Sequence, residues 1–189
     1  MGFLDILRGK RELKQPAPDR LFAMSTAYVT LQTELDLTSR GVAGIVFQAL
    51  ETSDFTEILK DMEEVVRATA ADTGGQVENQ TDSFGYRWMI LRDEDFEDLV
   101  VGVNAVGTAI QAGGYGDRLL AAVFAFEDAQ KRAVYFIYNY KRGTFYPFVP
   151  AGDKTRDNER ELRLKAQLSH EMPFEPELER WFPLWDIPI

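Results

Sequence analysis

Apolar residues recur along this chain with two periods, and each period predicts a kind of element. Between residues 55 and 69 they lie three and four positions apart, which is the spacing of a helix with one buried face. Asp54 is placed to cap that helix, and Gly74-Gly75 ends it. Phe96–Ile110 repeats the pattern before Gly113-Gly114, so we expect two amphipathic helices. The buried face of the first comprises Phe55, Ile58, Leu59, Met62, Val65, Val66 and Thr69.

Alternation with a period of two predicts strands in the first half of the chain. Tyr28–Leu37 alternates apolar and polar residues, and Val42–Leu50 follows after a turn, so we expect these segments to pair as a hairpin. Gln76–Glu78 and Phe84–Arg92 predict a second hairpin. A short helix near Asp19–Ala23 is expected to precede them.

The most apolar strands lie in the second half of the chain. Leu119–Glu127 and Ala133–Lys141 are apolar on both faces, so we expect them at the centre of a sheet with cover on each side. Thr144–Val149 adds a third strand. The composition of Asp157–Glu171 favours a helix.

The order of these elements predicts an α+β fold, with an antiparallel sheet built from repeated helix–hairpin units and helices packed on it. Pro16 and Pro18 separate two parts of the chain. Residues 1–15 form a short basic amphipathic segment, and residues 16–189 form a single α+β domain that ends in an aromatic tail.

The N-terminal segment combines an apolar helical face with basic residues, and residues 1–14 carry a charge of +2. Such a segment can bind weakly and reversibly to an anionic membrane surface. The alternatives are a short docking helix or a frayed tail. The candidate membrane-contact residues are Phe3, Leu4, Leu7, Arg8, Lys10 and Arg11.

Composition excludes several classes of function. The net charge of −10 argues against a nucleic-acid partner, which requires a basic face. Cysteine is absent, which removes disulfides and thiolate sites and fits a reducing compartment. Neither a run of about 18 apolar residues nor an export signal is present. We therefore expect a cytoplasmic protein, with contact at the inner face of the membrane as a further hypothesis.

Catalytic motifs are missing from the sequence. The one histidine, His170, cannot form a multi-histidine metal centre, and we interpret it as a capping or surface residue. Residues 113–116 are glycine-rich but follow a helix, whereas phosphate loops precede one. Residues 93–95 are acidic and are placed to cap the next helix. We expect no enzyme activity, no cofactor and no metal.

Two aromatic segments, Tyr140–Pro150 and Arg180–Trp185, are the densest in the chain. We predict that they lie together and form one surface for a protein partner, with aromatic rings as rigid anchors and arginine orienting the partner. The alternative is that the aromatic tail closes the core of its own domain. The candidate binding residues are Lys141, Arg142, Tyr146, Phe148, Arg180, Trp181 and Trp185.

Tyr140-Lys-Arg-Gly-Thr-Phe-Tyr-Pro-Phe148, Asp82-Ser-Phe-Gly-Tyr-Arg-Trp88 and Arg180-Trp-Phe-Pro-Leu-Trp185 resemble the PspAB family over nearly the full length of the chain. The resemblance implies association with PspA and the phage-shock envelope-stress system, and with a membrane zinc protease of the HtpX type. It implies no catalytic residues. The helix–hairpin order also resembles secretion-chaperone-like and YbjN-like domains, in fold pattern alone.

Two functions follow from these expectations. The first is a non-catalytic adaptor or regulator in the phage-shock envelope-stress response. The alternative is a chaperone-like module that holds an extended or helical segment of a client protein. The two differ chiefly in which proteins they bind.

Overall fold

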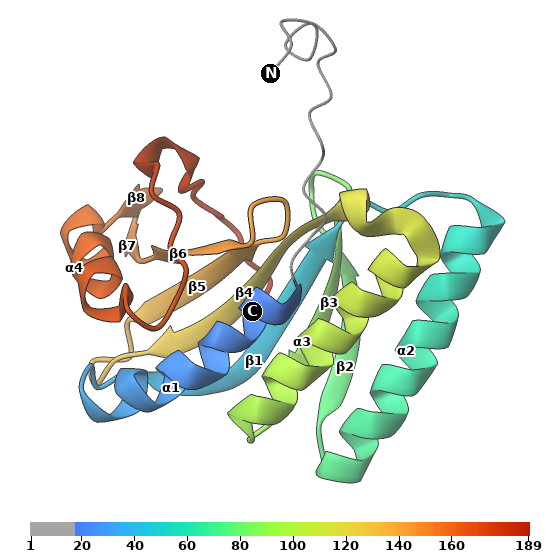
Figure 1. Cartoon of the computed structure of the whole chain (residues 1–189), viewed down its shortest axis with the longest axis horizontal. Coiled ribbons are helices and arrows are strands. Elements are labelled where there is room, and N and C mark those ends of the chain that lie inside the picture. The colour runs from blue at the N-terminus through green and yellow to red at the C-terminus, as the bar shows by residue number, and fades with distance from the viewer. Residues whose placement is uncertain (1–17) are drawn as a thin grey trace, which may run out of the picture.

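The structure is a computed structural model that describes residues 18–189. Six strands form one antiparallel sheet in the order β2-β3-β1-β4-β5-β6 (Figure 1). A two-stranded sheet of β7 and β8 lies beside β6. The strands are β1 (Thr38–Phe47), β2 (Gln76–Thr81), β3 (Arg87–Arg92), β4 (Leu119–Glu127), β5 (Ala133–Asn139), β6 (Thr144–Phe148), β7 (Pro150–Gly152) and β8 (Thr155–Arg156).

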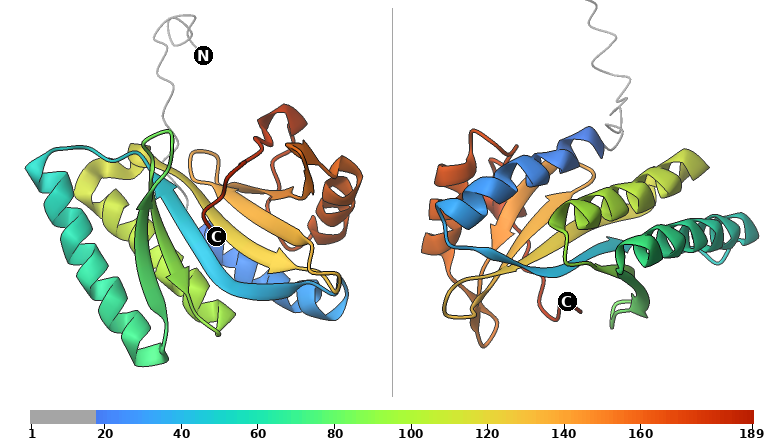
Figure 2. Two further views of the ribbon diagram at one scale, coloured as in Figure 1. Left: turned by 180° about the vertical axis from the view of Figure 1, so that it is seen from behind. Right: turned by 90° about the horizontal axis from the view of Figure 1, so that it is seen from below.

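Three helices cover one face of the sheet, and a fourth packs near β6 (Figures 1 and 2). The helices are α1 (Ala23–Thr33), α2 (Ser53–Thr73), α3 (Phe96–Ile110) and α4 (Asn158–Leu168), with shorter helical turns at Pro18–Phe22, Gln111–Tyr115, Gly116–Arg118 and Leu178–Arg180. The described residues therefore form the predicted α+β fold with an antiparallel sheet.

The ends of the predicted helices follow local chemistry. Asp95 caps α3, since its carboxylate accepts a hydrogen bond from the Glu97 N–H at 2.8 Å. Gly74 ends α2 with φ = +85°, a left-handed conformation that glycine adopts without strain. Asp54 lies in the first turn of α2 and does not cap it, because the cap position is Thr52.

Both faces of the sheet are buried, as expected for its apolar central strands. Along β4, Phe124 and Phe126 point into the core beneath the helices, whereas Val123 and Ala125 belong to a second core on the opposite face. This alternation explains why the strand is apolar throughout. The second core contains most of the aromatic residues singled out in the sequence.

The strand predicted at Tyr28–Leu37 is wrong, because the chain there is helix α1 up to Thr33. Leu21, Met24 and Leu31 recur at helical spacing and are completely buried, whereas Val29 is 62% exposed. β1 begins at Thr38, where a turn was expected, and it is a single strand that lies between β3 and β4. The helix–hairpin repeat therefore starts only with α2.

The predictions for residues 1–15 lie outside the described residues. This applies to the whole basic amphipathic segment and to each candidate membrane-contact residue in it. Those residues are Phe3, Leu4, Leu7, Arg8, Lys10 and Arg11.

Candidate functional site

The C-terminal tail first extends one edge of the sheet. The Phe145 N–H donates to the Pro173 carbonyl at 2.7 Å, and the Glu175 N–H donates to the Phe145 carbonyl at 2.8 Å. Phe174 forms a parallel bridge with Phe145. From there the chain crosses the face of the sheet that the helices leave uncovered (Figure 2).

Trp181 anchors this tail. Its side chain is 5% exposed, its ring stacks on Tyr146 with centroids 6.3 Å apart, and its Nε1 donates to the Glu175 carbonyl at 3.0 Å. Arg156 donates to the Trp181 carbonyl at 2.6 Å and to the buried Glu161 carboxylate at 2.9 Å. The tail is therefore fixed through both its aromatic ring and its backbone.

The two predicted aromatic segments do lie together. Tyr146 and Phe148 of the first segment and Trp181 of the second are buried where the segments meet. The ring of Trp185 packs edge-on against that of Phe148, with ring centroids 5.1 Å apart. This packing completes the second core, in agreement with the alternative prediction that the aromatic tail closes the core of its own domain. Whether any of these residues contacts a partner remains a prediction.

The arginines of the predicted surface are engaged within the molecule. Arg142 forms an ion pair with Glu175, whose side chain is 2% exposed, and also lies 3.5 Å from Glu177. Arg180 pairs with Glu177 at 2.9 Å. Lys141 is exposed and lines the groove described next. The arginines thus hold the tail in place.

A groove of about 790 Å³ opens on the same face, between the tail and the β2–β3 turn. Its lining is mostly apolar and draws on the ends of β1, β3 and β4 as well as on both flanking segments. Tyr146 and Trp185 of the predicted surface also line it. The remaining lining includes Val46, Gln80, Thr81, Asp82, Ser83, Phe84, Tyr86, Trp88, Leu120, Ala121, Asn139, Lys154, Phe182, Pro183, Leu184, Asp186 and Pro188.

Exposed aromatic rings flank the groove. Phe84 is 78% exposed on the β2–β3 turn, and Phe182 is 59% exposed on the tail. Neither was singled out as a binding residue in the sequence, because a single phenylalanine carries no signal of exposure. The glycine that follows Phe84 signals a turn, but the exposure of the ring follows only from the folded turn.

Asp82 orders the turn that carries Phe84. Its Oδ1 accepts the N–H groups of Phe84 and Tyr86 at 2.9 Å, and its Oδ2 accepts the indole N–H of Trp88 at 3.0 Å. Gly85 has φ = +83°, as such a tight turn requires. Phe84 is therefore held in solvent by a structured loop.

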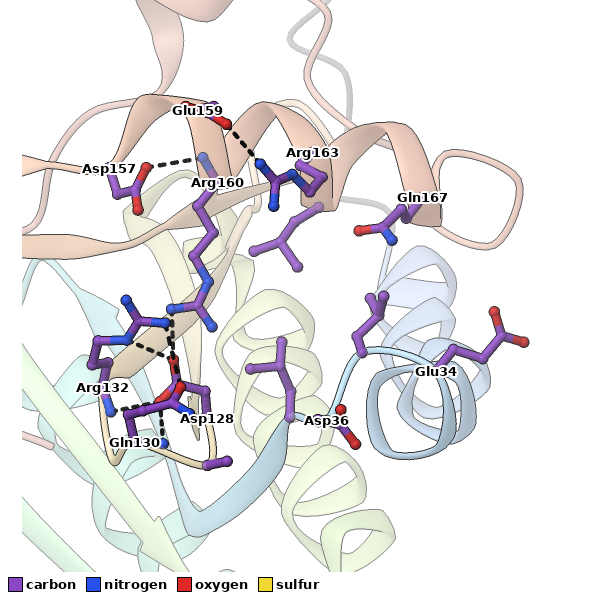
Figure 3. A pocket seen from close by; sticks show the side chains of 14 residues that line it. Glu34, Asp36, Asp128, Gln130, Arg132, Asp157, Glu159, Arg160, Arg163 and Gln167 are labelled. Atoms are coloured by element: carbon purple, nitrogen blue, oxygen red, sulfur yellow. Dashed lines mark hydrogen bonds and ion pairs between the residues drawn. The ribbon is translucent and has the colours of Figure 1, made fainter.

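A second hollow, of about 520 Å³, lies between α4, the β4–β5 turn and the end of α1 (Figure 3). Asp128 lines one side of it, 2.8 Å from Arg132 Nε and 2.8 Å from Arg160 Nη1. Burial by itself raises the pKa of Asp128, but hydrogen bonds from Arg132 and the Gln130 N–H, together with the adjacent Arg160 guanidinium, hold this pKa at about 2. The ion pair between Asp128 and Arg160 therefore ties α4 to the β4–β5 turn.

Two further features are absent from residues 18–189. No group of three or more carboxylate or imidazole side chains lies close enough to hold a metal ion. No helix in this part of the chain has the length and apolar character needed to cross a membrane.

The fold and the groove define an α+β protein with an apolar surface flanked by exposed aromatic rings. A family model, PspAB, described as PspA associated protein B, matches residues 1–189, and the chain belongs to this family. No curated protein and no solved structure matches it. The family name links the protein to PspA and the phage-shock response. The likeness to secretion-chaperone-like and YbjN-like domains stays a prediction.

Proposed function

We propose that this protein is a non-catalytic adaptor or regulator of the PspA-associated envelope-stress response, and that an apolar segment of PspA binds in the sheet-face groove. The observation that carries the proposal is the pair of exposed rings, Phe84 and Phe182, on either side of an apolar groove. Large rings that stay in solvent beside a concave apolar surface are typical of protein-binding sites.

Charge supports an apolar partner segment for this groove. Its lining contains two acidic residues, Asp82 and Asp186, and two lysines, Lys141 and Lys154. The groove is therefore neutral overall, and burial of apolar area is the main source of affinity that it offers. Since the Phe84 turn is already ordered by Asp82, a partner pays little entropy to fix that ring.

The non-catalytic part of the proposal is supported by the buried carboxylates. Three acidic side chains are buried among the described residues, and each contacts an arginine: Asp128 with Arg132 and Arg160, Glu161 with Arg156, and Glu175 with Arg142. Burial raises the pKa of Glu161, but its carboxylate is 1% exposed and accepts hydrogen bonds from Arg156 and the Val149 N–H. His170 is exposed and takes part in none of these pairs.

A chaperone-like module is the second candidate function. The same groove would then hold apolar segments of several client proteins, and an HtpX-type protease would be one such partner in place of PspA. The two functions differ in selectivity, because an adaptor prefers PspA whereas a chaperone binds unrelated apolar segments with similar affinity. Cytoplasmic location and weak membrane contact through residues 1–14 belong to the same proposal.

The test is a calorimetric titration of the full-length protein with purified PspA. The double variant Phe84→Ser/Phe182→Ser should bind PspA at least tenfold more weakly, because it loses two exposed rings, each of which contributes about 1 kcal/mol or more if it is a binding anchor. Its denaturation midpoint should stay unchanged, since both rings are exposed in the free protein.

Val29→Ser is the matched control, because Val29 is 62% exposed on α1, which covers the opposite face of the sheet from the groove (Figure 2). It should bind PspA as the wild type does. Equal affinity of the double variant and the wild type would remove the groove from the proposal. Binding of an unrelated apolar peptide as tight as that of PspA, and lost in the same double variant, would favour the chaperone function.

A further inference from the structure

Two lysines on the lining of the sheet-face groove lack carboxylate partners. Lys141 comes from the β5–β6 turn and Lys154 from the β7–β8 turn, and both side chains are exposed. Within residues 18–189 neither lysine forms an ion pair. Arg142 and Arg180, the cations expected to orient a partner, are instead paired with glutamates of the tail. The groove itself therefore offers lysine, and not arginine, to an anionic group.

The turn that carries Lys154 is strained. β7 and β8 are joined by a two-residue loop, Asp153-Lys154, in which φ is +45° and +54°. A hairpin loop with positive φ at both positions is filled readily by asparagine, aspartate and glycine. Lysine fits less well, because its Cβ lies too close to the following carbonyl oxygen in the left-handed conformation. Glycine would relieve this strain, so the lysine at position 154 indicates a role other than folding.

The strained turn is held in a fixed place. The Thr155 hydroxyl donates to the carbonyl that precedes the loop. Arg156 follows on β8 and donates to the Trp181 carbonyl at 2.6 Å and to the Glu161 carboxylate at 2.9 Å. The hairpin is thus anchored to the tail and to α4, and the backbone of Lys154 is ordered before a partner binds.

The acidic residues of the lining lie elsewhere. Asp82 belongs to the β2–β3 turn, and β1 and β4 lie between that turn and the β5–β6 turn (Figure 1). Neighbouring strands are about 4.8 Å apart, so β3 and β5 are separated by about 14 Å. Asp186 lies on the tail, and no ion pair joins it to a lysine of residues 18–189. The lysine side of the groove therefore attracts anionic groups.

We propose that the groove selects apolar segments that carry acidic residues, and that carboxylates of the bound segment pair with Lys141 and Lys154. This selectivity rests on the proposed function, because it takes the groove as a protein-binding site. Apolar burial supplies the affinity, whereas the ion pairs discriminate among apolar segments and fix the direction in which one lies. An anionic membrane fits less well, since Asp82 and Asp186 would face the same headgroups. A peptide can place its charges singly.

A pair of peptides tests this preference in the full-length protein. Both share one apolar core rich in leucine and phenylalanine, and the core is flanked by two glutamates in one peptide and by two lysines in the other. General attraction to a chain of net charge −10 favours the lysine peptide, so the opposite preference would come from the groove. In calorimetric titrations at low salt, the glutamate peptide should bind at least fivefold more tightly, because each exposed ion pair multiplies affinity by about two- to fivefold. Lys141→Glu/Lys154→Glu should reverse the preference.

A single substitution separates the charge of Lys154 from the conformation of its turn. Lys154→Gly should have a denaturation midpoint at or above that of the wild type, since glycine adopts positive φ without strain. It should bind the glutamate peptide about threefold more weakly, whereas Lys154→Arg should bind it as the wild type does. Lys131→Gly is the matched control, because Lys131 also has a positive φ, of +62°, and is 78% exposed on the β4–β5 turn outside the groove. This control should leave the affinity unchanged.

Equal binding of the two peptides, tighter binding of the lysine peptide, or a preference that survives in Lys141→Glu/Lys154→Glu would overturn the proposal. Tighter binding to phosphatidylserine vesicles than to either peptide, lost in the same variant, would assign the lysines to a membrane surface and would also overturn it. The proposed function fails on a different result, namely PspA binding that does not depend on Phe84 and Phe182. The peptide preference is measured without PspA, so the two failures are distinct.

Discussion

Replacing Asp128 by asparagine tests whether its ion pairs stabilise the fold. The carboxylate has a pKa of about 2, against 3.8 when unperturbed. This difference corresponds to about 2–3 kcal/mol at neutral pH before solvent screening, since one pKa unit is worth about 1.4 kcal/mol. Asp128 is 6% exposed but its partner Arg132 is 61% exposed, so screening lowers the net value to about 2 kcal/mol. Asp128→Asn keeps the size of the side chain and removes its charge, and it should lower the free energy of unfolding by about 2 kcal/mol.

The pH dependence gives a sharper test of the same residue. Because the pKa is lower in the folded state, the stabilisation is complete above about pH 4 and disappears as the pH falls through about 2. Linkage predicts that the difference between wild type and Asp128→Asn falls from about 2 kcal/mol at pH 7 to about 1 kcal/mol at pH 3. Urea denaturation at a series of pH values measures this difference directly.

Glu159→Gln is the matched control, since Glu159 borders the same hollow and pairs with Arg163 while its side chain is 84% exposed. Exposed pairs contribute about 0.5 kcal/mol or less, so this variant should stay close to the wild type at every pH. An Asp128→Asn variant that matches the wild type at pH 7, or a difference that stays constant down to pH 3, would refute the assigned role of Asp128.

Two further variants test the packing of the helices and of the tail. Gly107→Ala should destabilise the protein by about 1–3 kcal/mol in urea, although alanine favours helices, because the new Cβ would lie 2.8 Å from Tyr140 Oη; an increase in stability would contradict this. Glu175→Gln should cost about 2 kcal/mol, less than a fully buried pair because Arg142 is one-third exposed. It should also shift the tryptophan emission, to which Trp181 contributes with Trp88 and Trp185, to the red as the tail loosens, and an unchanged spectrum would argue that the ring alone fixes the tail.

The elements that could be predicted from the sequence are those in which burial alone determines the spacing of apolar residues. α2 and α3 bury one face each, and β4 is buried on both faces, so their sequences follow helical spacing or a continuous apolar run. α1 was missed because Val29 and its β-branched neighbours imitate strand alternation, while its buried residues extend upstream into the turn at Pro18–Phe22. The strand propensity of these residues was therefore more visible in the sequence than a helical pattern that is divided between two elements.

The site was predictable only in part. The density of aromatic residues correctly predicted that Tyr146 and Trp181 lie close together. It does not distinguish a ring that fills a core from one that faces solvent. The partners of the arginines were hidden for a similar reason, since Glu175 lies 33 positions from Arg142 in sequence. Exposure of Phe84 depends on three hydrogen bonds to Asp82, a contact that only the folded turn reveals.

The two edges of the sheet are unlike, and this difference limits how molecules can assemble through it. At one edge β6 is already covered by the segment around Phe174, whereas β2 is the outermost strand at the other. Among the described residues the sheet can therefore grow in one direction only. If two molecules joined through β2, each would present a capped edge to the outside, and growth would stop at a closed pair. In that arrangement, strand addition would end in a dimer and would not propagate into a fibre.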